Sequence, residues 1–263
     1  MEPWQIIVAL IQGLVEWLPI SSEGQAVLYV YNFATIPMES MLTLVVWLHL
    51  GTTLAVIVRY PRTILNIISI QDRKLVRSLL IATCGTAMTA IPLYIFLKET
   101  LTIFHGEIIN IFVGGLLFVT ALFLYLPTRH SEEEVIDQVE EPEDRQSLLA
   151  GLAQGFAVLP GLSRSGITIS ALLMQKIEKE EAMTFSFLMS VPAVLGIFVL
   201  DVIIGEAPLP VPIGDLVVIE IIVFVVGLAS MEVLLRLAKK VSFWKLCIVL
   251  GTVAIIFGIP ALI

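Results

Sequence analysis

The sequence predicts an all-α polytopic membrane protein with six transmembrane helices and two interrupted helical segments, and three observations carry this prediction. The first is composition: 58% of the 263 residues are hydrophobic, 14% are charged, and the mean hydropathy is +0.98. Soluble domains carry about 25% charged residues, so a water-soluble fold is excluded. The second is the recurrence of apolar stretches of about 20 residues, the length that a helix needs to cross a bilayer. The third is the presence of polar residues, proline and glycine inside two other apolar segments.

Six stretches are predicted to cross the membrane as uninterrupted helices. They are 41–58, 79–97, 108–126, 183–204, 214–235 and 246–263. The two interrupted segments are residues 4–30 and 148–175. Non-helical backbone at membrane depth is tolerated only where protein buries it or where it lines a wet cavity. Both segments are therefore predicted to be re-entrant hairpins or broken helices.

The two interrupted segments resemble each other, which predicts an internal repeat. Three short elements recur in the same order: Gln12-Gly13 and Gln154-Gly155, Leu18-Pro19 and Leu159-Pro160, and Ser21–Gly24 and Ser163–Gly166. Each half then holds one interrupted segment and three spans, and this odd number gives the second half the opposite orientation. We expect one membrane domain, 1–263, made of a first inverted repeat, 1–126, an acidic cytoplasmic linker, 127–147, and a second inverted repeat, 148–263. In such folds the site lies near the midplane, where the broken helices meet.

The distribution of charge predicts the orientation in the membrane. Lys and Arg gather in loops on one side of the predicted spans, within 59–77, 129–145, 176–179 and 236–245, whereas the other side holds only Lys98. By the positive-inside rule the crowded side is cytoplasmic. The prediction is a multi-pass protein of the plasma membrane whose site opens toward the extracytoplasmic side. No basic stripe is present, so we expect no nucleic-acid partner.

Arg164 is the residue that points most directly to a function. An arginine within apolar sequence costs from about 2.5 kcal/mol upward unless it is paired or hydrated, and its planar guanidinium suits a phosphate or a carboxylate. A helix that begins near Ser165 would aim free N–H groups and its positive dipole end at the same anion. An internal ion pair with Glu16 is the structural alternative. The neighbouring residues that supply hydroxyls or close backbone approach are Ser163, Ser165, Gly166 and Thr168.

Glu16 is the natural counterpart of Arg164. Gln12 and Glu16 are four residues apart, so they share a face if the segment before them is helical. A carboxylate within an apolar segment is a functional candidate by default, either as a general base or as a ligand of a divalent cation. Ser21 and Ser22 could supply a nucleophile or a phosphate contact.

Two further polar residues lie in or beside the predicted membrane segments. Glu23 is expected at the outer mouth of the hairpin, surrounded by solvent, and no role is predicted for it. His49 lies in the middle of a predicted span, and a single histidine on an apolar face is more often a core residue than a catalytic one.

The two polar motifs resemble those of the undecaprenyl-pyrophosphate phosphatase (bacitracin-resistance) family. Residues 16–25, Glu-Trp-Leu-Pro-Ile-Ser-Ser-Glu-Gly-Gln, are similar to the family pattern E-F-L-P-V-S-S-T-G-H. Residues 160–168, Pro-Gly-Leu-Ser-Arg-Ser-Gly-Ile-Thr, are similar to P-G-x-S-R-S-G-x-T. In motif order, spacing and span pattern the resemblance covers nearly the whole chain. It implies hydrolysis of a polyprenyl (undecaprenyl-type) diphosphate to the monophosphate and inorganic phosphate, which recycles the lipid carrier for cell-envelope glycan synthesis.

The resemblance also implies cofactors, partners and roles for particular residues. It implies a divalent cation, Mg²⁺ or Ca²⁺, with Glu16 as its ligand, and no organic cofactor. The partners are the polyprenyl diphosphate and the membrane, and a homodimer is left open. With the candidates chosen from the sequence, the predicted catalytic residues are Glu16, Ser22, His49 and Arg164. The predicted substrate-binding residues are Gln12, Ser21, Gln25, Gln154, Ser163, Ser165, Gly166 and Thr168.

The chain departs from the family pattern at two positions. Gln12 stands where the family usually has a second glutamate, and Gln25 stands where it has a histidine. The family commonly has glutamine at the position of His49, so we hypothesise that His49 reaches the same cavity and replaces the missing base. A ring more than about 8 Å from both Glu16 and Arg164, beyond the reach of one bridging water, would contradict this hypothesis.

A transporter or flippase of polyprenyl phosphate or another anion is the rival interpretation, because inverted repeats with broken helices are typical of transporters. A structural membrane protein with a vestigial site is the third.

Overall fold

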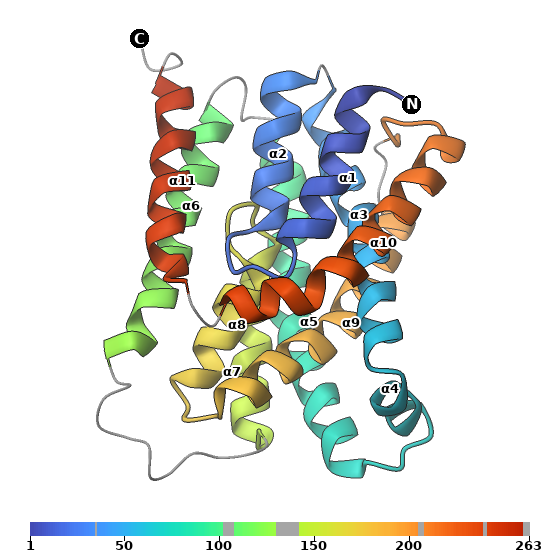
Figure 1. Cartoon of the computed structure of the whole chain (residues 1–263), viewed down its shortest axis with the longest axis vertical. Helices are drawn as coiled ribbons and strands as arrows, with labels where there is room; N and C mark the ends of the chain where they lie inside the picture. The colour runs from blue at the N-terminus through green and yellow to red at the C-terminus, as the bar shows by residue number, and fades with distance from the viewer. Residues whose placement is uncertain (35, 102–107, 130–141, 205–207, 239–240, 260–263) are drawn as a thin grey trace.

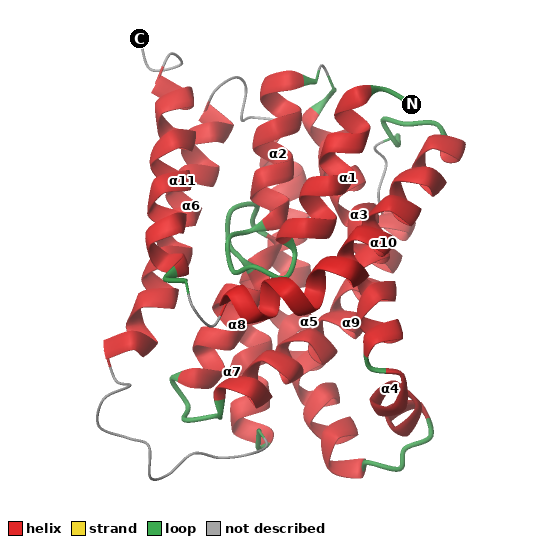
Figure 2. Cartoon of the chain, viewed as in Figure 1, coloured by secondary structure: helices red, strands yellow, loops and turns green. Residues whose placement is uncertain are grey.

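The computed structural model describes residues 1–263 with the exception of 35, 102–107, 130–141, 205–207, 239–240 and 260–263. All regular secondary structure in these described residues is helical, so the predicted all-α class is confirmed (Figure 2). The α-helices are α1 (Pro3–Val15), α2 (Ser22–Phe33), α3 (Met38–Arg59), α4 (Pro61–Ile68), α5 (Arg73–Leu101), α6 (Ile108–Tyr125), α7 (Asp144–Gly155), α8 (Arg164–Leu173), α9 (Lys179–Ile204), α10 (Ile213–Ala238) and α11 (Phe243–Gly258). Short 3₁₀ turns, η1 (Leu126–Arg129) and η2 (Phe156–Val158), follow α6 and α7.

Five helices are long and apolar enough to cross a membrane. They provide the stretches Ser40–Arg59, Arg73–Leu97, Ile108–Thr128, Lys179–Ile203 and Ile213–Val233, which coincide with the first five predicted spans. The sixth predicted span, 246–263, falls on α11, an apolar helix of 16 residues that is shorter than the other five. Its last four residues lie outside the described part of the chain, so this span stays a prediction.

The outward faces of these helices carry large apolar side chains. Phe96 on α5, Leu122 on α6, Val199 on α9 and Ile221 on α10 are all more than half exposed. Such a surface suits hydrocarbon rather than water, and a helix satisfies its own backbone hydrogen bonds there. The chain is therefore a multi-pass membrane protein, as predicted from its composition.

Both interrupted segments are helical hairpins broken at the centre, the first of the two forms predicted, since α1 packs on α2 and α7 packs on α8 (Figure 1). The first runs from α1 through a non-helical stretch, 16–21, into α2, and the second runs from α7 through 159–163 into α8. Each stretch contains a proline, Pro19 or Pro160, which cannot continue a helix. Each ends on a serine cap: Ser21 Oγ accepts the Gly24 N–H at 3.1 Å, and Ser163 Oγ accepts the Gly166 N–H at 3.2 Å. The repeated Ser-X-X-Gly pattern thus begins the two short helices.

The two non-helical stretches meet at the centre of the molecule, between α2 above and α8 below in Figure 2. The Gly161 N–H donates to Ser21 Oγ at 3.2 Å, which joins the second stretch to the first. Thr120 on α6 holds the second stretch from the other side, donating to the Gly161 carbonyl at 3.0 Å and accepting the Ser163 N–H at 3.0 Å. Protein therefore buries the irregular backbone, which is the condition for its presence at membrane depth.

The remaining helices enclose this pair of stretches. Figure 1 shows α6 and α11 side by side along one edge of the molecule, and these two helices share many contacts. On the other side α1 packs on α10, and α10 packs on α3. The inverted relation of the two halves and the bounds 1–126, 127–147 and 148–263 stay predictions, and residues 130–141 of the acidic linker lie outside the described residues.

Candidate active site

A cavity of about 120 Å³ opens where the two non-helical stretches face α3, α5 and α9. One ordered water needs about 10–15 Å³, so the cavity has room for a small anion or several waters. One part of its wall is polar and the other is apolar. The polar part is lined by Glu16, Ser21, Ser22, Glu23, His49, Thr86, Tyr94, Gln154, Ser163, Arg164, Ser165 and Ser190, and the apolar part includes Leu42, Val45, Leu97, Val194 and Ile197.

Glu16 is the centre of the polar wall, and it is 5% exposed. One carboxylate oxygen, Oε1, accepts a hydrogen bond from Arg164 Nη2, so an ion pair joins the first broken helix to the second. The other oxygen, Oε2, accepts from Gln12 Nε2 at 3.0 Å and from Ser22 Oγ at 2.5 Å. The ion pair left open as a structural alternative does form, but both of its members also face the cavity.

Arg164 is the first residue of α8, as the predicted helix start requires. Its guanidinium has a second, longer contact of 3.5 Å to the Ser186 carbonyl on α9. The N-terminal end of α8, with its N–H groups and positive dipole end, lies beside the same cavity. The Arg164 side chain and the N-terminal end of α8 therefore lie at the same cavity, and each can bind an anion.

His49 also reaches the cavity, from the middle of α3. Its Nδ1 lies 2.7 Å from the Val45 carbonyl, so the proton on Nδ1 is donated to that oxygen and the other ring nitrogen is left for the cavity. Nε2 lies 3.5 Å from Glu16 Oε2, well within the 8 Å limit that the hypothesis set. His49 therefore has the position that the hypothesis requires, and its role as a base stays a prediction.

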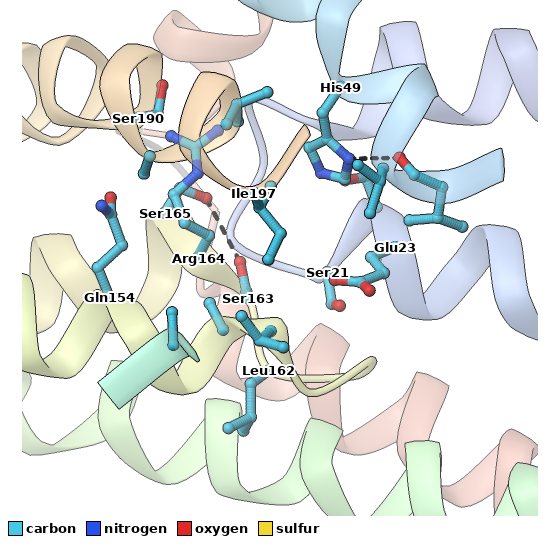
Figure 3. Close-up of a pocket in the computed structure, with 18 of the residues that line it drawn as sticks. Ser21, Glu23, His49, Gln154, Leu162, Ser163, Arg164, Ser165, Ser190 and Ile197 are labelled. Atoms are coloured by element: carbon cyan, nitrogen blue, oxygen red, sulfur yellow. Dashed lines mark hydrogen bonds between the residues drawn. The ribbon is translucent and has the colours of Figure 1, made fainter. Parts of the chain in front are cut away.

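Four serines besides Ser22 line the cavity with hydroxyls that also have partners in the protein, and one of them, Ser190, donates to the Phe187 carbonyl at 2.7 Å. Ser21 Oγ accepts two backbone N–H groups, from Gly24 and Gly161. Ser163 Oγ lies 3.3 Å from Ser165 Oγ (Figure 3). Ser165 Oγ in turn donates to the Leu18 carbonyl at 3.4 Å. These hydroxyls are fixed in position before any ligand binds.

Four of the predicted substrate-binding residues lie outside the lining of the cavity. Gln12 is fully buried, and its Nε2 donates a hydrogen bond to Glu16 Oε2. Gln25 Nε2 donates to the Ile20 carbonyl at 3.2 Å. The Gly166 N–H is used by Ser163, and Thr168 Oγ1 contacts the Arg164 carbonyl at 2.8 Å and Ser186 Oγ at 2.5 Å. In this structure these four residues shape the wall rather than face its interior.

Gln154, the repeat counterpart of Gln12, does line the cavity, on the opposite side of Arg164 from Ser21 in Figure 3. Its Nε2 donates to Thr86 Oγ1 at 3.0 Å and to the Met189 carbonyl at 3.4 Å. Its Oε1 is buried and has no partner in the described part of the chain. This side of the cavity therefore offers a hydrogen-bond acceptor.

Glu23, in the first motif, does not lie where it was predicted. It was expected in solvent at the mouth of the hairpin, but it is half-buried and lines the cavity. The reason is that α2 begins at Ser22, which puts Glu23 in the first turn of that helix. An acidic residue in a first helical turn is a recognisable signal, but it does not reveal which way the side chain points.

The described residues do not by themselves form a site for the predicted divalent cation. No three His, Cys, Asp or Glu side chains gather within reach of one ion in the described ranges. Both oxygens of Glu16 already accept hydrogen bonds from Arg164, Gln12 and Ser22. Because Mg²⁺ and Ca²⁺ bind six or more oxygen ligands, this donor set is too small. The cation stays a prediction, and no step below depends on it.

Comparison with known proteins places the chain in a family. The family model described as bacitracin resistance protein BacA matches residues 5–256. A protein of Methanothrix thermoacetophila named undecaprenyl-diphosphatase is 37% identical over 95% of this chain and 94% of its own length. Proteins of the same name from Methanopyrus kandleri and Desulforapulum autotrophicum are 36% and 34% identical, and each match covers at least 98% of both chains. The chain belongs to the bacitracin resistance protein BacA family.

Proposed function

We propose that this protein hydrolyses a polyprenyl diphosphate of the undecaprenyl type to the monophosphate and inorganic phosphate, and so recycles the lipid carrier for cell-envelope glycan synthesis. The observation that carries the proposal is the Ser22 Oγ to Glu16 Oε2 hydrogen bond of 2.5 Å beside Arg164. It places a hydroxyl, a base and a phosphate-binding cation at one point. The relatives named undecaprenyl-diphosphatase support the same substrate.

The terminal phosphate would bind at Arg164 and at the N-terminal end of α8. A guanidinium can bind two phosphate oxygens at once, and the free N–H groups of the helix favour the same charge. Because Arg164 pairs with Glu16 in the structure, an arriving phosphate competes with that carboxylate for the guanidinium. Binding would thus loosen the hold of Arg164 on Glu16 and leave the carboxylate more available as a base.

The hydrolysis would begin at Ser22. Glu16 Oε2 takes the proton of the Ser22 hydroxyl as Oγ attacks the terminal phosphorus, and the anhydride bond to the prenyl monophosphate breaks. His49 Nε2, 3.5 Å from the same oxygen, can accept that proton from Glu16. Water then hydrolyses the phosphoserine, which releases inorganic phosphate and restores Ser22.

The apolar wall of the cavity suits the start of a prenyl chain. Leu42 and Val45 on α3, Leu97 on α5 and Ile197 on α9 line it, and their side chains need no hydrogen-bond partner. With the predicted orientation these positions lie in the outer half of the membrane. The substrate would therefore enter from the outer leaflet, and the phosphate would leave to the extracytoplasmic side. The six-span inverted repeat, plasma-membrane location and homodimer remain parts of the proposal.

Phosphate release from a C55 and a C15 prenyl diphosphate by the purified full-length protein tests the proposal. We expect release that Arg164→Ala and Glu16→Gln reduce by about 10²-fold or more, the usual loss when one charged catalytic group is removed. Arg59→Gln is the matched control, because Arg59 pairs with Glu232 away from the cavity. Parallel reactions with Mg²⁺, Ca²⁺ or a chelator test the predicted cation.

Phosphate release by the wild-type protein that is no greater than release by Arg164→Ala would contradict the proposal. The transporter alternative receives no support from the names of the relatives, and it predicts that negative result together with specific binding of the diphosphate.

A further inference from the structure

Glu23 is a carboxylate to which the proposed chemistry gives no role, although it lines the same cavity as Glu16, Ser22 and Arg164. It follows Ser22 in the chain, lines the same cavity, and makes no hydrogen bond or ion pair with another residue that the structure describes. Figure 3 shows it beside Ser21, on the side of the cavity where His49 lies. The other carboxylate of the cavity, Glu16, is paired with Arg164 and lines the same cavity as Glu23.

The charges of the cavity make an ionised Glu23 unfavourable when a diphosphate binds. Arg164 is the cation of the cavity wall, and Glu16 already balances it. A second carboxylate with no cation beside it would repel the incoming phosphates, as like charges at close range do. A proton on Glu23 removes this repulsion and turns the side chain into a hydrogen-bond donor for a phosphate oxygen.

The other titratable groups that face this part of the cavity already have partners. His49 on α3 donates from Nδ1 to Val45 and presents Nε2 to Glu16. Tyr94 on α5 donates its hydroxyl proton to Asp201 on α9. Among the helices packed on α2, α1 carries no titratable side chain, and Tyr125 is the only titratable residue of α6, at the end of that helix. Among these titratable groups, Glu23 is therefore the one whose carboxylic acid proton is free to be donated to a phosphate oxygen.

We propose that Glu23 binds the diphosphate as the carboxylic acid and acts as the acid–base residue of the reaction. This inference rests on the proposed function. As Ser22 Oγ forms its bond to the terminal phosphorus, the anhydride P–O bond breaks, and Glu23 gives its proton to the oxygen that leaves with the prenyl monophosphate. In the second step a water attacks the phosphoserine and gives a proton to Glu23, while His49 returns the Ser22 proton to Glu16 and Ser22 Oγ leaves and recovers that proton from Glu16. Each group ends in the state in which it began.

Binding of a prenyl methylenediphosphonate, which the protein cannot hydrolyse, tests the first half of the proposal. The affinity of the wild-type protein should fall as the pH rises and Glu23 loses its proton, whereas Glu23→Gln should remove that part of the pH dependence. Because the ligand itself also titrates, the quantity that decides is the difference between the two proteins. We expect this difference to reach about tenfold between about pH 6 and about pH 9.

Glu220→Gln is the matched control, because Glu220, like Glu23, is a half-buried glutamate in a helix. Glu220 lies on α10 and does not line the cavity. Its variant should follow the wild-type binding curve at each pH. Identical pH dependence in the wild type and Glu23→Gln would overturn the proposal.

Kinetics test the second half. Glu23→Gln should lower kcat by about 10²-fold to 10⁴-fold, the usual contribution of a general acid or base, and should remove the alkaline fall of the rate with little change in KM. Glu23→Asp should keep that fall with a reduced kcat, since it retains a carboxylic acid. A lower kcat with the wild-type pH profile would instead mean a structural role.

Two further outcomes keep this inference separate from the proposed function. If Glu23→Gln raises the half-saturating Mg²⁺ concentration and keeps the wild-type kcat at saturating Mg²⁺, Glu23 is a cation ligand and the inference is wrong. A wild-type protein that binds the analogue but releases no phosphate contradicts the proposed function itself. A wild-type protein that hydrolyses the diphosphate beside an equally active Glu23→Gln contradicts this inference alone.

Discussion

At the scale of single residues, the chemistry of the cavity depends on three side chains that can carry a charge, Glu16, Glu23 and Arg164, and on the ion pair between Glu16 and Arg164. Arg164 and Glu16 could be predicted from the sequence because a charged side chain in an apolar segment is costly unless it has a function or a partner. In the structure they pair with each other, and both line the cavity. Glu16 thus neutralises the buried guanidinium of Arg164 until an anionic ligand binds to it.

His49 lies close enough to Glu16 to accept a proton from its carboxyl group. We expect His49→Gln to lower kcat by about tenfold to 10²-fold, because an amide can replace the hydrogen bond of the ring but cannot carry the Ser22 proton away from Glu16. KM should change little, since the ring contacts Glu16 and Val45 rather than the phosphate-binding residues. Phosphate release measured across the pH range is the test, and a kcat within about twofold of the wild type would contradict it.

Residues that face the cavity from distant helices could not be predicted in the same way. Thr86 and Tyr94 come from α5 and Ser190 from α9, and their local sequences are those of ordinary apolar helices. They become part of the wall only because α5 and α9 pack around the second broken helix. Glu23 was missed for a related reason: tertiary packing decides that the first turn of α2 lines the cavity.

At the scale of secondary-structure elements, the two broken helices hold the site by backbone contacts that depend on glycine. Gly161 has a φ of +113°, and a Cβ atom there would lie 2.7 Å from the Val113 carbonyl oxygen. The same residue donates to Ser21 and accepts from Thr120. A side chain at this position would separate the second stretch from α6, and with it Arg164 from Glu16.

We therefore expect Gly161→Ala to destabilise the fold by about 1–3 kcal/mol, the cost of holding a non-glycine residue in such a conformation, and to lower phosphate release. Gly115→Ala is the matched control on α6, since a Cβ atom there meets nothing within 4 Å and alanine favours a helix. Thermal unfolding of both variants in the same detergent is the measurement. Equal unfolding temperatures for the two variants would show that the Gly161 conformation is not under strain.

At the scale of the whole molecule, the membrane class and five spans followed from composition and span length, because lipid leaves a chain few alternatives to long apolar helices. The sixth span, predicted over 246–263 by the same criteria, stays a prediction, since α11 has 16 helical residues, fewer than the five helices long enough to cross. The short helix α4, between the first two spans, was not predicted. Its apolar residues Leu65 and Ile68 are well exposed. From the sequence alone, this short segment was taken as part of a loop.

The orientation of the molecule decides from which leaflet the cavity can be entered. Leu42, Leu97 and Ile197 lie near the ends of α3, α5 and α9 on the side where α10 begins. The basic residues at the end of α3, in α4 and at the start of α5 lie on the other side, and the positive-inside rule assigns that side to the cytoplasm. The apolar wall then faces the outer leaflet.

Labelling of single cysteines with a membrane-impermeant maleimide tests this orientation in intact cells. In a background in which Cys84 and Cys247 are replaced by alanine, we expect Gly214→Cys to be labelled from outside and Gln71→Cys only after permeabilisation. Both positions are exposed, and a Cβ atom at Gly214 meets nothing within 4 Å. The reverse pattern would place the apolar wall in the inner leaflet, so that the diphosphate would have to be hydrolysed on the cytoplasmic side, where its phosphate product would also be released.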